Sequence, residues 1–281
     1  MSHEFSLILM IALTAVAILT GHVALGWLAL ARRNPSPTLG WKEQLTLAGV
    51  LGTGACATAI LGLTNEVVEH AIGYGAVAAP VLWLGAVILC LPLSAALAHS
   101  SSGWAVALAT VLLTAVAAAA QMGWVWAAGF RPGVQWDYKV LGAACTLMVA
   151  GFACAIWVAG TIKSSSRTSG SARRDPQYVL KFGSAAVLGL SLMVGQQIML
   201  GGADLDMQRG SVYRNQVPGT LMALACGALL PLTLAVMSLE LSMRNKRRQE
   251  RRRSGRSSSG ISSNSFAPQQ RSRRRHGERR Q

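Results

Sequence analysis

The sequence contains few charged residues, and they are distributed unevenly. Asp, Glu, Lys and Arg make up 13% of the 281 residues, whereas soluble domains carry roughly 25%. Of the 26 Lys and Arg residues, 14 lie from Arg244 onward, where only Glu250 and Glu278 oppose them, so this segment holds +12 of the formal net charge of +15. The high charge therefore belongs to a tail and not to a basic globular fold, which argues against nucleic acid as a partner.

Recognisable catalytic motifs are also missing. The chain has no His-Glu-x-x-His motif, no Gly-rich phosphate loop and no evident nucleophile–base pair. Its five cysteines lie within apolar stretches and none forms a Cys-x-x-Cys pair. We therefore expect them to pack as small hydrophobic side chains rather than to bind a metal. We predict that the protein is not an enzyme, and these residues point to no cofactor.

Long apolar runs, in contrast, are abundant. Seven of them can each cross the roughly 30 Å hydrocarbon core of a membrane, which takes a helix of about 20 residues. They lie at residues 6–31, 45–64, 77–98, 104–129, 140–162, 179–200 and 218–243. Ala, Gly, Ser and Thr recur in them, as expected where membrane helices pack closely. We predict an all-α, polytopic membrane helix bundle with seven transmembrane helices.

The loops between these runs predict an orientation. Lys and Arg concentrate after the first, fifth and seventh runs, whereas the alternate loops also carry acidic residues. The positive-inside rule places the Lys- and Arg-rich side in the cytoplasm, so we expect the N-terminus outside and the C-terminus inside. Aromatic residues predict an outer interfacial belt at Trp124, Trp126, Trp136 and Tyr138, and an inner belt at Trp27, Trp41, Trp104 and Trp157.

Residues 244–281 differ in composition from the membrane domain at 1–243. They are rich in Arg, Ser and Gln and poor in apolar residues, so we expect this tail to be disordered. A basic cluster beside a membrane span gains about 1 kcal/mol per residue from an anionic membrane surface. We predict contact with anionic lipid headgroups, and RNA or an acidic protein is the alternative partner. The residues concerned are Arg244, Lys246, Arg247 and Arg248.

The second, fourth and sixth apolar runs end in a similar pattern. A polar or small pair, followed by apolar residues and a glycine, occurs at residues 57–63, 119–124 and 195–201. One occurrence per pair of runs indicates three two-helix repeats plus one closing helix. Its polar members, Gln121, Gln196 and Gln197, are predicted to lie at one depth near the outer face. One interpretation is that Gln121 and Gln197 hydrogen-bond across the bundle and close it, at about 1 kcal/mol for each bond.

These features resemble the MHYT-domain family, a group of seven-span bacterial membrane sensor domains. The resemblance covers about residues 2–243 and rests on residues 2–9 and 21–25, and on the span count, orientation and motif depth. The family carries Met-His-(Tyr or Phe)-x-Gly-Met motifs at the outer ends of its even-numbered spans. This chain resembles a degenerate member that lacks the motif histidines, whose positions are taken by Ala59, Gln121 and Gln196 or Gln197.

The resemblance implies a site and a location. A role in sensing oxygen, CO or NO through a bound metal, with copper as the expected ion, has been proposed for the family. His and Met side chains suit copper, and the resemblance makes His3, Met122 and Met199 the candidate metal ligands in this chain. It also implies a bacterial cytoplasmic membrane as the location.

Three functional hypotheses follow from the sequence. The first is a non-enzymatic sensory or accessory module with an outward-facing site, read out in the cytoplasm by the tail or by a membrane or cytoplasmic protein partner. The second is a structural subunit or assembly factor of a larger membrane complex that docks through small-residue helix faces. The third, a small-solute transporter, is disfavoured because no acidic residue lies deep within an apolar run.

Overall fold

The structure is a computed structural model of the chain. It describes residues 2–32, 40–66, 72–99, 102–130, 134–161, 176–204, 211–213 and 216–262. The chain divides into two compact units, Met1–Ser238 and Leu239–Gln281. This division falls close to the boundary after residue 243 that the composition predicts.

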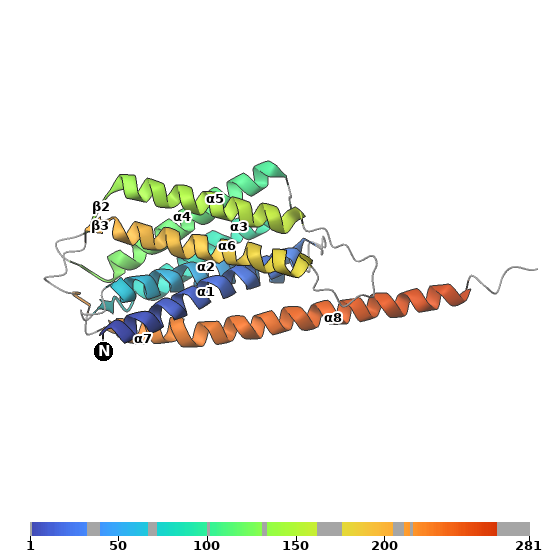
Figure 1. Cartoon of the computed structure of the whole chain (residues 1–281). Helices are drawn as coiled ribbons and strands as arrows, with labels where there is room; N and C mark the ends of the chain where they lie inside the picture. Colours follow the sequence, from blue (N-terminus) through green and yellow to red (C-terminus); the bar gives the residue numbers. More distant parts are fainter. Residues whose placement is uncertain are drawn as a thin grey trace, which may run out of the picture. The chain divides into compact units, whose positions relative to one another are not determined.

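Seven helices in the described residues are long and apolar enough to span a membrane, which confirms the predicted number. Six are α1 (Ser2–Ala31), α2 (Gly40–Glu66), α3 (Ala78–His99), α4 (Gly103–Ala127), α5 (Tyr138–Thr161) and α6 (Pro176–Gly201). The seventh span is built from α7 (Gly219–Leu224), η2 (Ala225–Leu229) and the first part of α8 (Leu230–Ser262). The protein is therefore a multi-pass helical membrane protein (Figure 1).

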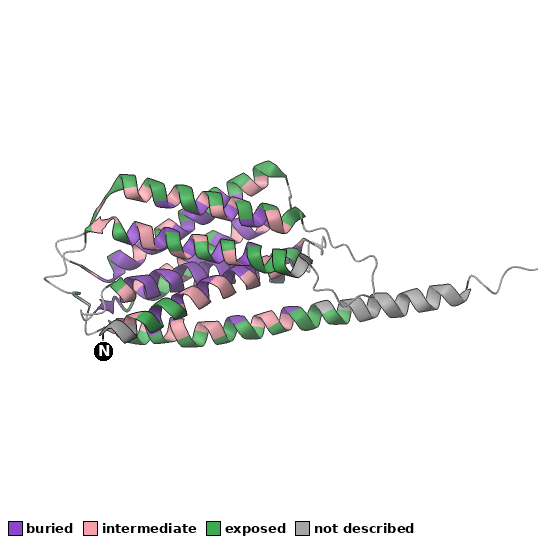
Figure 2. Ribbon diagram, in the orientation of Figure 1, coloured by how far each residue is buried: buried purple, intermediate pink, exposed green. Residues whose placement is uncertain are grey.

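The helices pack as three hairpins around a central trio. The helices α2, α4 and α6 contact one another, and three further helices each contact two of them: α1 packs against α2 and α6, α3 against α2 and α4, and α5 against α4 and α6. This arrangement confirms the three predicted two-helix repeats, and η2 adds the closing span against α1 and α2. Helix α2 is the most buried span. In its most apolar stretch 78% of the residues are buried, against 44% or less in the corresponding stretch of every other span (Figure 2).

Helices α1 and α6 approach each other at two glycines. A Cβ atom on Gly21 of α1 would overlap the carbonyl oxygen of Ala185, and one on Gly189 of α6 would overlap the carbonyl oxygen of Ala17. The obstacle in both cases is backbone, so the crossing has no room for a larger side chain. Such glycine contacts let membrane helices gain packing energy where lipid provides no hydrophobic drive between them.

The seventh span is interrupted by the π-helical segment η2. The backbone N–H of Leu230 bonds the carbonyl of Ala225, which lies five residues earlier. Pro231 follows directly and has no N–H, so the carbonyl of Gly227 cannot form the usual bond to the residue four positions later. The helix adjusts to this proline by forming a π segment directly before it.

The first half of the tail is helical, whereas the composition predicts disorder for the whole tail. Helix α8 continues past Arg244 to Ser262, so the first half of the basic segment has helical backbone. Arg, Lys, Gln and Glu are good helix formers, and Glu240 and Arg244 form an i,i+4 ion pair with an Nη2–Oε1 distance of 2.7 Å. Residues 263–281 lie outside the described part of the chain.

Short strands close one end of the bundle, which we call the N-terminal face because α1 begins there and α2, α4 and α6 end there. Strand β1 (Gly73–Tyr74) pairs antiparallel with β4 (Val217–Pro218), and β2 (Gln135–Trp136) pairs antiparallel with β3 (Ala203–Asp204). A further bridge joins Phe130 to Ser211. We call these strands and the segments 128–130 and 211–213 the loop layer.

Candidate functional site

Gln196 ties the three central helices together below the N-terminal face. Its side chain is wholly buried. Its amide Nε2 donates to the carbonyl of Ala55 on α2 at 3.1 Å and to the carbonyl of Ala117 on α4 at 3.2 Å, and its Oε1 accepts from the hydroxyl of Thr58 at 2.6 Å. One glutamine on α6 therefore bridges α2 and α4, with every polar atom of its amide engaged.

Gln121 of α4 has no comparable partners. Its side chain is 0% exposed, yet neither its Nε2 nor its Oε1 has a hydrogen-bond partner among the described residues. It lies four residues beyond Ala117, which places it one helical turn, or about 6 Å, closer to the N-terminal face than the Gln196 bridge. A wholly buried and unpaired primary amide therefore lies within the central trio.

Gln197 contributes a further unpaired group at the same depth. Its Nε2 is buried without a partner in the described part of the chain, and a Cβ atom on Gly62 of α2 would overlap it. Gly62 is one turn beyond Thr58, just as Gln121 is one turn beyond Ala117, so both amides lie one turn outward from the Gln196 bridge. We call Gln121 and Gln197 the amide site.

The placement of the three glutamines corrects one interpretation of the sequence. The interhelical bonds suggested for Gln121 and Gln197 are made by Gln196. Adjacent residues on a helix point about 100° apart, so only one of Gln196 and Gln197 can face the carbonyls of α2 and α4 directly. Thr58, which accompanies Gln196, was missed as a site residue, although it lies within the repeated pattern at 57–63.

An aromatic cluster lies next to the amide site along α4. Trp124 is wholly buried, with its ring edge-to-face against Tyr74 at a centroid distance of 5.3 Å and against Trp83 at 6.2 Å. The prediction that Trp124 belongs to an interfacial belt is therefore wrong, because neighbouring segments cover it. Burial also raises the pKa of Tyr74, so its phenol stays uncharged.

The other predicted belt residues differ in exposure. Trp126 and Tyr138 are 73% and 81% exposed near the N-terminal face. At the opposite face the prediction fails for Trp27, which is buried at 3% exposure. The remaining aromatic residues of that face, Trp41, Trp104 and Trp157, are exposed.

Ser211 fastens the loop layer over the aromatic cluster. Its hydroxyl oxygen lies 2.6 Å from the carbonyl of Ala128 and 2.9 Å from the carbonyl of Gly73, and it accepts from the backbone N–H groups of Gly73 and Tyr213 at 3.2 Å. The side chain thus joins the segment after α4, strand β1 and the segment before α7. Sequence reasoning gave no sign of this role, because an isolated loop serine has no distinguishing pattern.

We expect Ser211→Ala to lower the free energy of unfolding by about 1–2 kcal/mol, because it removes a partner from buried backbone groups. Thermal unfolding of the purified protein measures the loss, and hydrogen exchange should increase at the backbone N–H groups of Gly73 and Tyr213, which donate to the Ser211 hydroxyl. The control is Thr146→Ala, which removes an exposed hydroxyl that bonds only within α5. Unchanged exchange at both sites would contradict the proposed fastening role.

The structure describes the side chains of two of the three predicted metal ligands. Met199 is buried at 1% exposure on α6, whereas Met122 on α4 is partly exposed. His3 lies in the first turn of α1, but its side chain is outside the described residues. Within the described residues, no group of three His, Cys, Asp or Glu side chains could hold a metal ion. The copper site implied by the MHYT resemblance therefore stays a prediction.

The structure describes the side chains of three of the four basic residues of α8 that are predicted to contact lipid headgroups. Arg244 is paired with Glu240 through both its Nε and Nη2 atoms. Lys246 and Arg247 are exposed, and the side chain of Arg248 lies outside the described residues. Contact of this segment with anionic headgroups stays a prediction.

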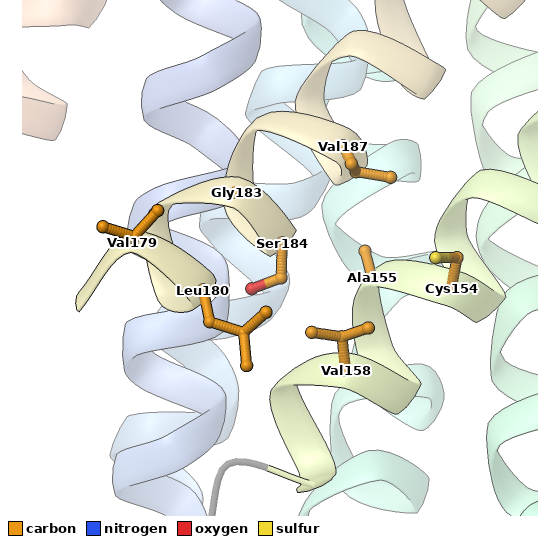
Figure 3. Close-up of a pocket in the computed structure, with 8 residues that line it drawn as sticks. All are labelled: Cys154, Ala155, Val158, Val179, Leu180, Gly183, Ser184 and Val187. Carbon is orange, nitrogen blue, oxygen red and sulfur yellow. The ribbon is translucent and has the colours of Figure 1, made fainter. Parts of the chain in front are cut away.

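A groove between α5 and α6 is a separate candidate site. It has a volume of about 390 Å³ and is lined mainly by apolar and small residues, among them Cys154, Val158 and Gly183 (Figure 3). The hydroxyl of Ser184, which also lines it, donates to the carbonyl of Lys181 on its own helix. The groove therefore presents an apolar surface within the membrane-spanning part and little polar chemistry.

Comparisons with known proteins leave the family open. No family model matches the chain, and neither a curated protein nor a solved structure matches it.

Proposed function

We propose that the protein is a non-enzymatic sensory module of a bacterial cytoplasmic membrane, with the N-terminal face outside and a ligand bound at the amide site. The observation that supports this proposal best is Gln121, which is wholly buried with both polar atoms of its amide unpaired in the described structure. The three-hairpin arrangement, with polar residues at the ends of α2, α4 and α6, agrees with the MHYT resemblance.

The energetic argument concerns the cost of an unpaired amide. A buried polar group without a partner costs about 1–3 kcal/mol, and more where hydrocarbon replaces water. Gln196 already joins the three helices, so a second glutamine is not needed to hold them together. A leucine at position 121 would fill the space without leaving polar atoms unpaired. A bound ligand, in contrast, would give the amide of Gln121 hydrogen-bond partners.

The proposed mechanism follows from the location of the site. A ligand held by Gln121 would lie on α4 one turn beyond the Gln196 bridge, at the depth of Gln197 on α6. Binding would favour the arrangement in which these helices lie closest, since a ligand shifts an equilibrium only through different contacts in its two states. The helices of the trio would carry this shift through the bundle, and the basic segment or a protein partner would read it.

Native mass spectrometry of the full chain in lipid nanodiscs tests the proposal. We expect the wild type to retain a small molecule at a one-to-one ratio and Gln121→Leu to lose it, because the leucine has no polar group to bind the ligand. The matched control is Gln135→Leu, which removes an exposed glutamine of β2 and should leave binding unchanged. Wild-type protein that carries no bound molecule under mild extraction would contradict a ligand-binding function.

A further inference from the structure

The amide site also limits the chemistry of its ligand, and this inference rests on the proposed function. The primary amide of Gln121 has an oxygen that accepts hydrogen bonds and an NH₂ group that donates two. Both atoms are buried and unpaired within the described residues. Gln197 adds a buried Nε2 donor at the same depth. A ligand must therefore offer an acceptor and a donor side by side to satisfy Gln121 fully.

The surrounding helices favour an uncharged ligand. Span α4 contains no Asp, Glu, Lys, Arg or His between Gly103 and Ala127. The charged residues of α2 and α6 lie near the helix ends: Lys42, Glu43 and Glu66 on α2, and Lys181 on α6. Glu66 lies one turn beyond Gly62 and is exposed, so a charge at the buried amide of Gln121 would face no charged side chain at its own depth on these three spans. An unpaired charge within a membrane protein is costly. The neutral phenol of Tyr74 adds no charge at this face.

The neighbouring positions also favour a small ligand. Gln121 is completely enclosed, and the residues around its depth on α2 and α4 include the buried Ala59, Gly62 and Ala120. The loop layer, fastened by Ser211, covers this end of the bundle. Because no water-sized space adjoins the amide atoms of Gln121 in this structure, a ligand has to displace neighbouring side chains, and only a molecule of a few non-hydrogen atoms needs a small displacement.

We infer that the amide site binds a small, uncharged molecule that carries a hydrogen-bond donor next to an acceptor, as a primary amide, urea or un-ionised carboxylic acid does. The acceptor of the ligand faces the Nε2 of Gln121, and its donor faces the Oε1, so the two groups form a pair of parallel hydrogen bonds.

Acetamide is the probe for this inference, with N,N-dimethylacetamide as its matched control, because the two share a carbonyl but only acetamide can donate. Thermal unfolding of the full chain in nanodiscs is followed while each compound is titrated. We expect acetamide to raise the unfolding temperature saturably, with a dissociation constant in about the millimolar range for so small a ligand. The dimethyl compound should have no saturable effect, and Gln121→Leu should abolish the response to acetamide.

Several results would overturn the inference. Equal effects of the two compounds on the wild type would exclude a donor–acceptor pair, and this comparison holds even if Gln121→Leu does not fold. An equal acetamide response in wild type and Gln121→Leu would mean that the amide of Gln121 is satisfied by water only. A metal ion or charged molecule found by native mass spectrometry would overturn the ligand class but leave the proposed function standing. Absence of any bound molecule together with no acetamide response would overturn both.

Discussion

Gly189→Val is expected to lower the free energy of unfolding by about 3 kcal/mol or more, the largest effect of any substitution considered. A Cβ atom at this position would overlap the carbonyl oxygen of Ala17, and its nearest neighbours are all backbone atoms of α1. Backbone within a helix cannot rotate away as a flexible side chain can. Helices α1 and α6 would therefore have to separate along a crossing that also includes Gly21.

Unfolding of the purified protein in mixed detergent, or by heat in nanodiscs, measures this loss. The matched control is Gly183→Val on the same helix, because a Cβ atom there would meet no heavy atom within 4 Å. The control therefore separates close packing from the general effect of a β-branched residue in α6. Similar stability of the two variants would rule out a tight α1–α6 crossing.

Gln196→Leu is expected to lower the free energy of unfolding by about 2 kcal/mol. The change removes the bonds to the carbonyls of Ala55 and Ala117 and the bond from Thr58, and side-chain bonds within membrane proteins are worth about 0.6 kcal/mol on average. The loss stays moderate because the Thr58 hydroxyl can still donate to the carbonyl of Gly54, which lies at 2.8 Å. Thermal unfolding in nanodiscs measures the effect.

Gln197, the residue next to Gln196, provides the matched comparison for this loss of stability. Gln197→Leu should change stability by less than about 0.5 kcal/mol, because the Nε2 of Gln197 has no partner to lose within the described structure. A double-mutant cycle of Gln196→Leu with Thr58→Val isolates the bond between these two side chains. If Gln197→Leu were the more damaging of the two glutamine variants, α6 would have to be rotated from its position here.

The number of spans could be predicted from the sequence because the bilayer restricts what an apolar run can do. A segment of about 20 apolar residues must satisfy its backbone internally, and a helix achieves this. All seven predicted runs are helices in the structure. The repeated polar pattern at the ends of the even-numbered runs also predicted the three hairpins, because helices in equivalent positions place equivalent residues at one depth.

The details of the candidate site could not be predicted in the same way. The pattern placed Gln121, Gln196 and Gln197 at similar depth, but it could not tell which glutamine faces which helix. That depends on the rotation of α6 about its axis, which follows from its close contacts with α1 at Gly189 and with Met148 at Gly195. Trp124 was assigned to the membrane interface for a similar reason, since composition does not reveal that Tyr74 and Trp83 enclose it.

The sequence by itself therefore determined the membrane class, the seven spans and their grouping into hairpins, because these follow from hydrophobic length and from a repeated pattern. The tertiary structure alone decided that Gln196 is fully bonded whereas Gln121 is buried and unpaired in the described part of the chain. Depth along a helix can be read from residue number, but direction around the helix is fixed only when the neighbouring helices pack against it.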